Sequence, residues 1–143
     1  MKKGWHFISI IFLLIVCIFI VSCSNDVQND NLWETAMYTD DAEVGTGSKM
    51  FFVEVKAEDK SVMFTVNTDE ETVGKALSEN NLIAGENGAY GLYVKSVNGI
   101  VADYNIDQSY WAFYKDGQYM QTGVDRTEFA DGDRFELVRE TVK

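Results

Sequence analysis

The chain has 143 residues, enough for one domain with a single hydrophobic core. It carries 23 acidic and 12 basic residues and a formal net charge of −11, which excludes binding to nucleic acid or anionic lipid through bulk electrostatics. Its two cysteines and its single histidine all lie at or before Cys23, so the rest of the chain has neither a thiol nor an imidazole.

The first residues have a pattern typical of a bacterial lipoprotein. Lys2 and Lys3 form a short basic region, and residues 7–21 carry no charge, which suits a secretory signal and is short for a membrane-spanning helix. Ser22 and Cys23 complete an Ile-Val-Ser-Cys segment that resembles the lipobox of lipoprotein signal peptides. The resemblance implies cleavage before Cys23 and a diacylglycerol on its thiol. The alternative is an uncleaved N-terminal anchor with an incidental cysteine; in both cases the remaining chain lies outside the cytoplasmic membrane.

Removal of residues 1–22 limits the chemistry of the mature protein. His6 and Cys17 leave with the signal peptide, and lipid occupies Cys23. Two lysines and no acids are lost, so the net charge becomes −13. These losses exclude a Ser-His-Asp triad, a Cys-His pair and a histidine-ligated zinc site. Catalysis by carboxylates alone stays open, but no carboxylate pair is marked for it, and we expect neither an enzyme nor a bound metal or cofactor.

Residues 23–48 are predicted to be a lipidated, acidic and disordered tether. The stretch after Cys23 contains six acids and no base, with little hydrophobic periodicity. Trp33, Met37 and Tyr38 are unusual in a spacer and could pack on the domain or on a partner. The globular domain is expected to occupy residues 49–143.

The domain should open with two strands and a helix. Apolar residues alternate over 51–57 and again over 62–66, with a turn at Asp59-Lys60 that would pair Ala57 with Val62; a longer loop is also open, because Asp-Lys is not a favoured turn. Thr68 and Glu71 have the spacing of a capping box and predict a helix from there to about Asn80 or Asn81.

Further strands are expected in the second half of the chain. Residues 90–94 alternate, and Asn98-Gly99 is a strong hairpin signal before residues 100–102. Strands over 110–115 and 118–122 would flank a turn at Asp116-Gly117, and residues 134–140 would form the last strand. The predicted fold class is α+β, a β-grasp-like arrangement with a mainly antiparallel sheet and one helix packed on one face.

The second half of the chain resembles the bacterial transcobalamin-like C-terminal domain family, domain of unknown function 4430. The resemblance covers roughly residues 50–141. The matching elements are Thr72 to Leu77, Asn98-Gly99, Ala102-Asp103, Tyr110-Trp111-x-Phe113-Tyr114, Asp116-Gly117, Thr122 to Asp125 and Asp131-Gly132-Asp133.

The family is similar to the smaller domain of the animal cobalamin carriers, which closes over cobalamin against a larger helical barrel. The resemblance implies a β-grasp-like fold and a ligand- or partner-binding role, but fold alone does not establish corrinoid binding. This chain departs from the carriers because it has no helical barrel and no histidine to ligate cobalt.

The Asp116-Gly117 turn predicts which side chains share a face. Its register puts Trp111, Phe113 and Met120 on the core side. Three tyrosines fall on the opposite side and form the candidate ligand or partner face, with Tyr104 of the preceding loop as an extension; the three are Tyr110, Tyr114 and Tyr119. The alternative is simple cross-strand packing on a solvated face, but tyrosine also suits adaptable binding.

Two acidic loops have some features of cation sites, but both match ordinary turns or polar loops better. Asp103, Asn105 and Asp107 have the spacing that opens a calcium loop, but Gln108 and Tyr114 stand where that loop needs glycine and glutamate. A polar loop is the preferred interpretation here, and a turn is preferred for residues 131–133.

The leading hypothesis is a non-catalytic binding or interaction domain, anchored in the membrane through lipid on Cys23 and exposed outside the cell. Its ligand could be a corrinoid. The alternative is a structural or adhesive surface module that binds protein or cell-wall polymer. A concave apolar pocket of a few hundred Å³ would favour a small ligand, whereas a flat aromatic patch or an open strand edge would favour adhesion.

Lipidation at Cys23 is the first testable prediction. Mass spectrometry of the protein extracted from membranes should find an acylated cysteine at the mature N-terminus, and a Cys23→Ser variant should be neither cleaved there nor lipidated. A mature chain that starts at another residue would contradict the prediction.

Overall fold

The computed structural model describes residues 31–142. The predicted signal peptide, 1–22, and the predicted lipidation site, Cys23, lie outside the described residues. No helix within residues 31–142 is long and apolar enough to cross a membrane.

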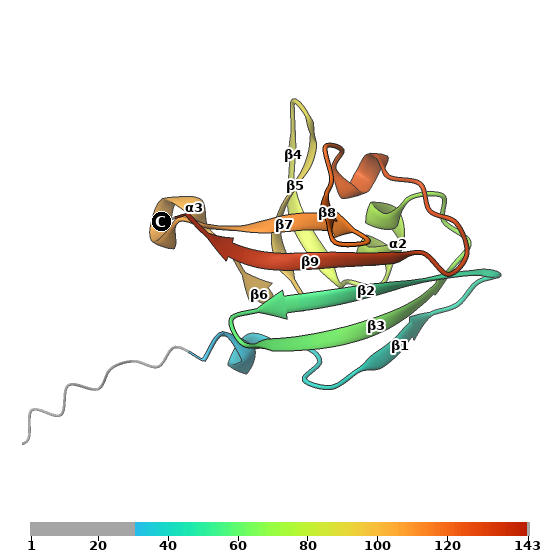
Figure 1. The fold of residues 1–143 in the computed structure, drawn as a ribbon, viewed down its shortest axis with the longest axis horizontal. Helices are drawn as coiled ribbons and strands as arrows, with labels where there is room; N and C mark the ends of the chain where they lie inside the picture. Colours follow the sequence, from blue (N-terminus) through green and yellow to red (C-terminus); the bar gives the residue numbers. More distant parts are fainter. Residues whose placement is uncertain (1–30, 143) are drawn as a thin grey trace, which may run out of the picture. The chain divides into compact units, whose positions relative to one another are not determined.

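A six-stranded mixed sheet forms the base of the domain (Figure 1). Its spatial order is β1-β3-β2-β9-β7-β8. β1 lies parallel to β3 and β2 parallel to β9, and the other three pairs of neighbours are antiparallel, so the predicted, mainly antiparallel sheet also contains two parallel pairs and is mixed. The strands are β1 (Ala42–Gly45), β2 (Lys49–Ala57), β3 (Lys60–Thr68), β7 (Ser109–Lys115), β8 (Gln118–Tyr119) and β9 (Arg134–Thr141).

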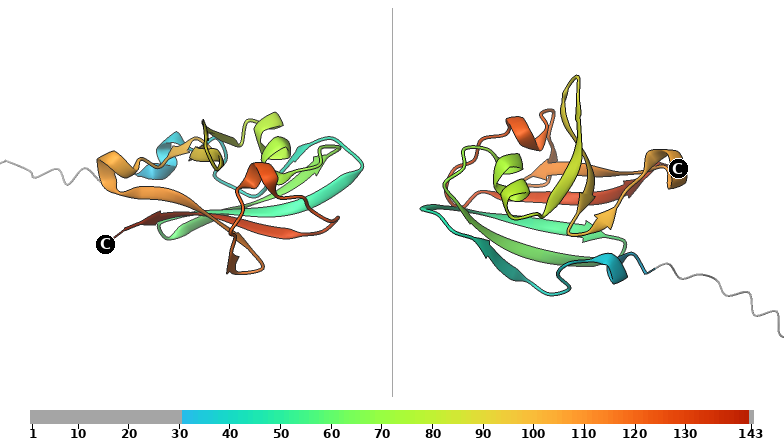
Figure 2. Two further views of the ribbon diagram at one scale, coloured as in Figure 1. Left: turned by 90° about the horizontal axis from the view of Figure 1, so that it is seen from above. Right: turned by 180° about the vertical axis from the view of Figure 1, so that it is seen from behind.

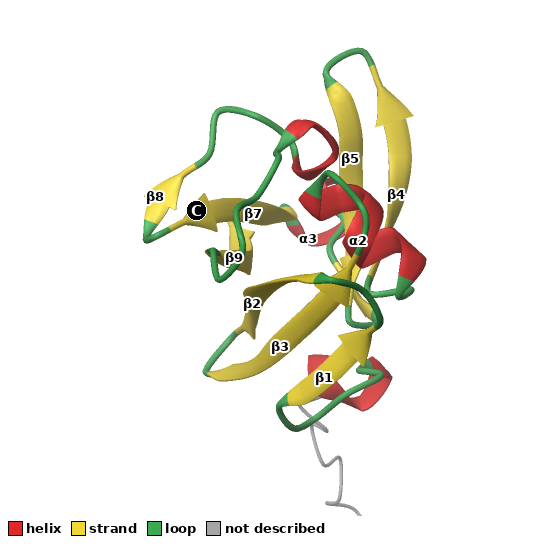
Figure 3. Cartoon of the chain, turned by 90° about the vertical axis from the view of Figure 1, so that its right-hand side faces the viewer, coloured by secondary structure: helices red, strands yellow, loops and turns green. Residues whose placement is uncertain are grey.

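A second, three-stranded antiparallel sheet and several short helices cover one side of this base (Figure 2). The small sheet consists of β4 (Ile83–Gly88), β5 (Gly91–Val97) and β6 (Ile100–Val101), and the β4–β5 hairpin projects from the body. The helix α2 (Val73–Glu79) packs against β3 and β4, as the side view shows (Figure 3). The remaining helical turns are η1 (Leu32–Thr35), α3 (Tyr104–Asp107) and η2 (Val124–Arg126).

The first hairpin has the predicted faces but a different register. Alternate residues of β2 and β3 point into the core, and Phe51, Val53 and Phe64 are fully buried. Val55 lies opposite Val62, and the turn is formed by Glu58 and Asp59, with Glu58 in the left-handed region at φ 56°. The predicted pairing of Ala57 with Val62 is therefore wrong by two residues. Because the register is shifted by an even number of residues, every side chain stays on its predicted face, and the predicted core residues of this hairpin are correct.

Helix α2 begins four residues later than the capping box predicted. The side chain of Thr72, not Thr68, caps the helix by accepting from the N–H of Lys75. Thr68 instead accepts from the N–H of Glu70, and the Asp69 carboxylate accepts from both the N–H and the hydroxyl of Ser48. The side chains that suggested an early cap thus organise a turn before the helix. The helix ends at Glu79, and Asn81 adopts the predicted left-handed conformation at φ 57°.

Residues 31–48 are part of the folded domain, which corrects the predicted disordered tether over this range. Trp33 is 5% exposed, and its indole N–H donates to the carbonyl of Ala57 at 3.1 Å. The buried Asn98 side chain bonds both backbone groups of Tyr38, and β1 then adds to the edge of the large sheet. The acidic composition of this segment indicated disorder. Its few apolar residues are nevertheless ordered, because they contact partners that are distant in the sequence.

Trp33 should therefore be a stability residue. We expect Trp33→Ala to lower the free energy of unfolding by about 3–5 kcal/mol, because it removes a large buried side chain and leaves a carbonyl without its donor. Chemical denaturation of the full-length chain in detergent measures the change. Met37→Ala, in the same segment but with 48% of the side chain exposed, is the control and should change little. A small loss for Trp33→Ala would mean that this segment does not support the domain.

Candidate functional site

The β7–β8 hairpin has the predicted turn and register. Asp116 and Gly117 both have positive φ, and Tyr114 lies opposite Tyr119. Trp111 and Phe113 point into the core, with 8% and 7% of their surfaces exposed. The strand β8 ends at Tyr119, so the predicted strand to Thr122 is shorter than expected. The N-terminal half of β7 consequently has no strand partner on the side away from β9.

The predicted tyrosine face is held together by one carboxylate. Tyr110 and Tyr114 donate their hydroxyls to the two oxygens of Glu140 at 2.6 and 2.5 Å. The hydrogen bond to the anionic Glu140 carboxylate is the main cause that raises the pKa of each phenol to about 12, and burial is the second cause. The Tyr119 ring packs edge-on against Tyr114, with centroids 5.5 Å apart, and is 56% exposed. Two of the three hydroxyls are thus engaged internally, and Tyr119 is the member most available to a ligand.

Tyr104 lies apart from these three residues. It is 50% exposed on α3, beyond the N-terminal end of β7. In the same loop the Asp103 side chain caps α3, and the Asp107 carboxylate accepts from Ser109 and pairs with Arg139. The carboxylates that resembled a calcium loop are therefore engaged in a structural network.

The turn at residues 131–133 also uses its carboxylates internally. Asp131 accepts from the N–H of Met50 at 2.7 Å, and Asp133 pairs with Lys115 at 2.7 Å. Within residues 31–142 no three Cys, His, Asp or Glu side chains are grouped so as to hold a metal ion.

A recess of about 330 Å³ lies between the β4–β5 hairpin, the unpaired edge of β7 and the loop after β8. Its wall is largely aromatic and aliphatic. The lining residues are Tyr90, Leu92, Tyr93, Val94, Tyr110, Trp111, Phe113, Tyr119, Met120, Gln121, Thr122, Gly123, Val124 and Leu137. Two of the predicted face residues, Tyr110 and Tyr119, line it, whereas Tyr114 and Tyr104 do not.

The contribution of the β4–β5 hairpin was not predicted from the sequence. Tyr90 at its tip is 92% exposed, and Tyr93 is 46% exposed. The sequence does contain a signal for this contribution, namely Tyr90 between Gly88 and Gly91. A tyrosine at the tip of a glycine-flanked turn is too far from the core to pack in it, so it is free to contact a ligand. The prediction treated the alternation over 90–94 only as a strand.

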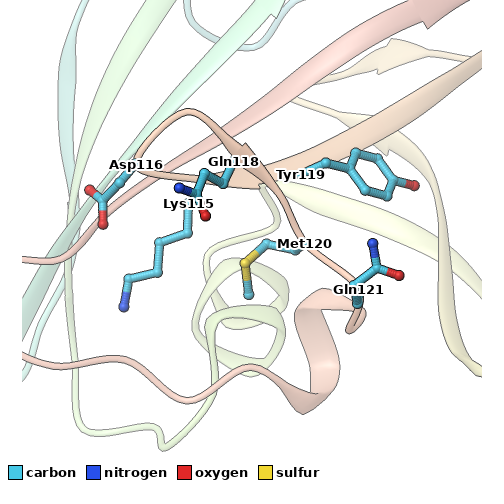
Figure 4. A pocket seen from close by; sticks show the side chains of 6 residues that line it. All are labelled: Lys115, Asp116, Gln118, Tyr119, Met120 and Gln121. Carbon is cyan, nitrogen blue, oxygen red and sulfur yellow. The ribbon is translucent and has the colours of Figure 1, made fainter.

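A second hollow, of about 410 Å³, lies on the β7–β8 hairpin itself (Figure 4). The side chains of Lys115 and Met120 point to the same side of the hairpin, and the Tyr119 ring points away from them. Tyr119, Met120 and Gln121 line both hollows. The outer part of this hairpin thus separates a polar hollow from the aromatic recess.

Comparisons with known proteins fall on this same part of the chain. Residues 70–137 match the family model described as domain of unknown function DUF4430. A protein from Ruminococcus gnavus ATCC 29149, described as a candidate metal-binding protein, is 33% identical with a TM-score of 0.63, covering 67% of this chain and 100% of that one. A search of curated proteins finds no match.

A second solved structure shares the fold at lower identity. Haptocorrin in complex with Cbi is 19% identical with a TM-score of 0.54, covering 70% of this chain and 27% of the haptocorrin chain. The chain therefore spans only about a quarter of haptocorrin.

Glu140 should control the ionisation of the tyrosine face. The chain has seven tyrosines, and we expect the phenols of Tyr110 and Tyr114 to ionise near pH 12. Glu140→Gln removes the negative charge, so both pKa values should fall toward about 10. The ultraviolet absorbance of phenolate during an alkaline titration measures this, and Glu58→Gln in an exposed turn is the control. An unchanged titration in Glu140→Gln would contradict the network.

The same shift predicts the alkaline stability of the domain. The folded-state pKa of both phenols lies above the unfolded value of about 10, so their contribution to stability is complete below about pH 10 and is lost as the pH rises through about 12. Glu140→Gln should flatten this loss in denaturation measured between these pH values.

Proposed function

This chain belongs to the transcobalamin-like C-terminal domain family, domain of unknown function DUF4430, and from that premise we propose that it is a non-catalytic binding domain for a small, flat organic ligand such as a corrinoid. One of the two solved relatives is described as a candidate metal-binding protein, and the other is in complex with Cbi. The observation that carries the proposal is the recess between the β4–β5 hairpin and β7, whose largely aromatic wall could stack against one part of such a ligand.

The chemistry of the recess favours a planar apolar surface over a charged one. Rings of Tyr90, Tyr93 and Tyr119 border it from two hairpins, and each is exposed enough to change rotamer without unpacking the core. Aromatic rings offer a large contact area at a low entropic cost. A corrinoid has a flat macrocycle, and the haptocorrin relative is in complex with Cbi, so a corrinoid is the ligand we propose to test first.

We propose that the domain is displayed outside the cytoplasmic membrane and anchored there through lipid on Cys23. The support is the lipobox-like segment at residues 20–23. Because residues 31–48 belong to the domain, only residues 24–30 would separate the lipid from the fold, fewer than the tether predicted from the sequence. The domain could thus extend less far from the membrane than the predicted spacer of residues 23–48 would permit.

The arrangement of the large sheet supports a β-grasp fold. The strands after β1 have the order β3-β2-β9-β7-β8, with the first and last of them, β2 and β9, parallel at the centre. The helix α2 follows the first hairpin and packs on the same sheet. We propose this classification for the large sheet, with the small sheet as an addition to it.

Corrinoid binding is tested by calorimetric titration of the full-length chain in detergent with cyanocobalamin. Because the recess can contact only part of a corrinoid and residues 24–143 contain no histidine to ligate cobalt, we expect saturable binding of modest, micromolar strength. Tyr119→Ala should weaken binding by about fivefold or more, since an aromatic contact is worth about 1 kcal/mol. Tyr104→Ala removes an equally exposed tyrosine outside the recess and is the matched control.

The outcomes separate the two candidate functions. Binding that Tyr119→Ala weakens at unchanged thermal stability supports ligand capture. No binding up to about millimolar cyanocobalamin would contradict the corrinoid proposal and favour the alternative, a surface module that binds protein or wall polymer through the exposed tyrosines.

A further inference from the structure

Strand β7 has an edge that its neighbours leave partly open. It lies between β9 and β8, but β8 covers only its C-terminal end. On one side, the N–H of Asp116 donates to the carbonyl of Arg134 in β9 at 3.4 Å. On the other side, the carbonyl of Phe113 accepts from the N–H of Met120 at 2.9 Å. Because main-chain groups alternate sides along an antiparallel strand, even-numbered residues of β7 pair with β9 and odd-numbered residues face away from it.

Trp111 is the residue at which this edge is open. Its N–H and its carbonyl point away from β9, and β8 ends at Tyr119 before it can reach them. The chain then leaves β7 for η2, where the hydroxyls of Thr122 and Thr127 lie 3.1 Å apart. No loop or helix of residues 31–142 forms a main-chain hydrogen bond with Trp111. Its surface is nevertheless 92% covered, and covered main-chain groups are nearly always paired, so the sheet is incomplete at this residue.

The recess surrounds this edge on both faces of the large sheet. Trp111 and Phe113 line it from the inner face, and Tyr110 lines it from the outer face. Leu92 and Val94 contribute from β5, which contacts β7. Within residues 31–142, no charged side chain lines the recess. A strand laid along β7 would lie in this recess and would direct alternate side chains to the apolar inner face and to the tyrosines of the outer face.

The charges next to the open edge favour a basic occupant. Lys115 of β7 and Arg139 of β9 each form an ion pair within the domain. Glu140 lies opposite Tyr110 and accepts only neutral hydroxyls among residues 31–142, so its negative charge is not neutralised there. The whole chain has a net charge of −11, so two copies repel each other and a basic segment is attracted. These charges favour a segment of another protein over a second copy of this chain.

We infer that the open edge of β7 takes one more antiparallel strand, a short extended segment of a partner protein with an apolar residue between two basic ones. The apolar residue would exchange both main-chain hydrogen bonds with Trp111 and share its inner face. The basic residues would point to the outer face, where their stems lie beside Tyr110 and their cationic ends reach toward Glu140. Addition of a strand to a sheet edge is a general mode of peptide recognition. This site goes beyond the proposed small-ligand function, although both occupants would use the same recess.

A peptide of sequence acetyl-Thr-Lys-Val-Lys-Thr-amide is the probe. An ester bond in place of the valine amide removes the N–H that would donate to the Trp111 carbonyl and keeps the shape of the peptide. The matched control has the ester at the second lysine, whose N–H would point away from β7. Titration of the full-length chain in detergent is followed by the NMR signal of the Trp111 main-chain N–H. Isotope labels on tyrosine carbonyl carbon and tryptophan nitrogen identify this signal, because tyrosine precedes tryptophan only at Tyr110-Trp111.

We expect the peptide to shift this signal saturably and to slow the exchange of the N–H with water, because the N–H becomes hydrogen-bonded. The valine ester should bind about fivefold more weakly, as expected for the loss of one main-chain hydrogen bond, whereas the lysine ester should bind as tightly as the parent peptide. Glu140→Gln should weaken the parent peptide about threefold at low salt, because it removes an attractive charge. Glu58→Gln, in an exposed turn of the first hairpin, is the matched control and should have no effect.

Four results would overturn the inference: a Trp111 signal that the peptide does not move, a valine ester that binds as tightly as the lysine ester, an equal effect of the two glutamate variants, or a signal that moves with protein concentration alone. The last result would mean that two copies pair through β7.

The corrinoid proposal fails separately. Peptide binding without cyanocobalamin binding would support the added strand and contradict the corrinoid, whereas cyanocobalamin binding without peptide binding would do the reverse. If both bind, they should compete, because both would occupy the recess; independent binding would place the peptide elsewhere and contradict the inference.

Discussion

The parallel pairing of β2 with β9 is the interaction on which the rest of the domain depends. It joins the first hairpin to the last strand of the folded chain, from Phe52 beside Arg134 to Ala57 beside Arg139. On the inner face it places Val53 next to Phe135, and on the outer face the Arg134 guanidinium lies over the Phe52 ring at 4.6 Å. Without this pairing β7 and β8 would have no sheet to join, and the recess would lose the floor that Leu137 contributes.

Short sequence patterns correctly predicted the turns and the inner faces of strands, because these features depend on residues that are close together in the sequence. Asn98-Gly99 and Asp116-Gly117 form the expected turns, because both residues of each pair adopt the positive φ that such turns require. Alternation in β2, β3 and β9 predicted the inner faces correctly. The parallel neighbours of β2 and β3 could not be predicted, since β1 is short and acidic and β9 lies about 80 residues away. The helix start was misplaced for a related reason: Asp69 is engaged by Ser48, a partner that the local pattern does not reveal.

In the candidate site, too, local sequence predicted some features, while contacts between distant residues determined others. The hairpin register was sufficient to bring Tyr110, Tyr114 and Tyr119 to one face, but the carboxylate that binds two of them comes from Glu140 at the end of β9. The face is consequently more rigid and less available than three free tyrosines would be. Trp111 was correctly assigned to the core, yet it also lines the recess, because β8 ends before it can cover that part of β7. A residue's inward direction is a property of its strand, whereas its access to a ligand depends on where the neighbouring strand stops.

The contacts of Asn98 have a mechanical consequence. Its side chain and its carbonyl hold Met37 and Tyr38, while its own backbone forms the turn that directly follows β5. Residues 33–38 are therefore joined to both sheets. Trp33 bonds Ala57 of the large sheet, and Asn98 links Tyr38 to the small sheet, whose strand β5 is a wall of the recess. Force applied to residues 33–38 thus reaches the recess through Asn98 and β5, and it reaches the large sheet through the Trp33 indole.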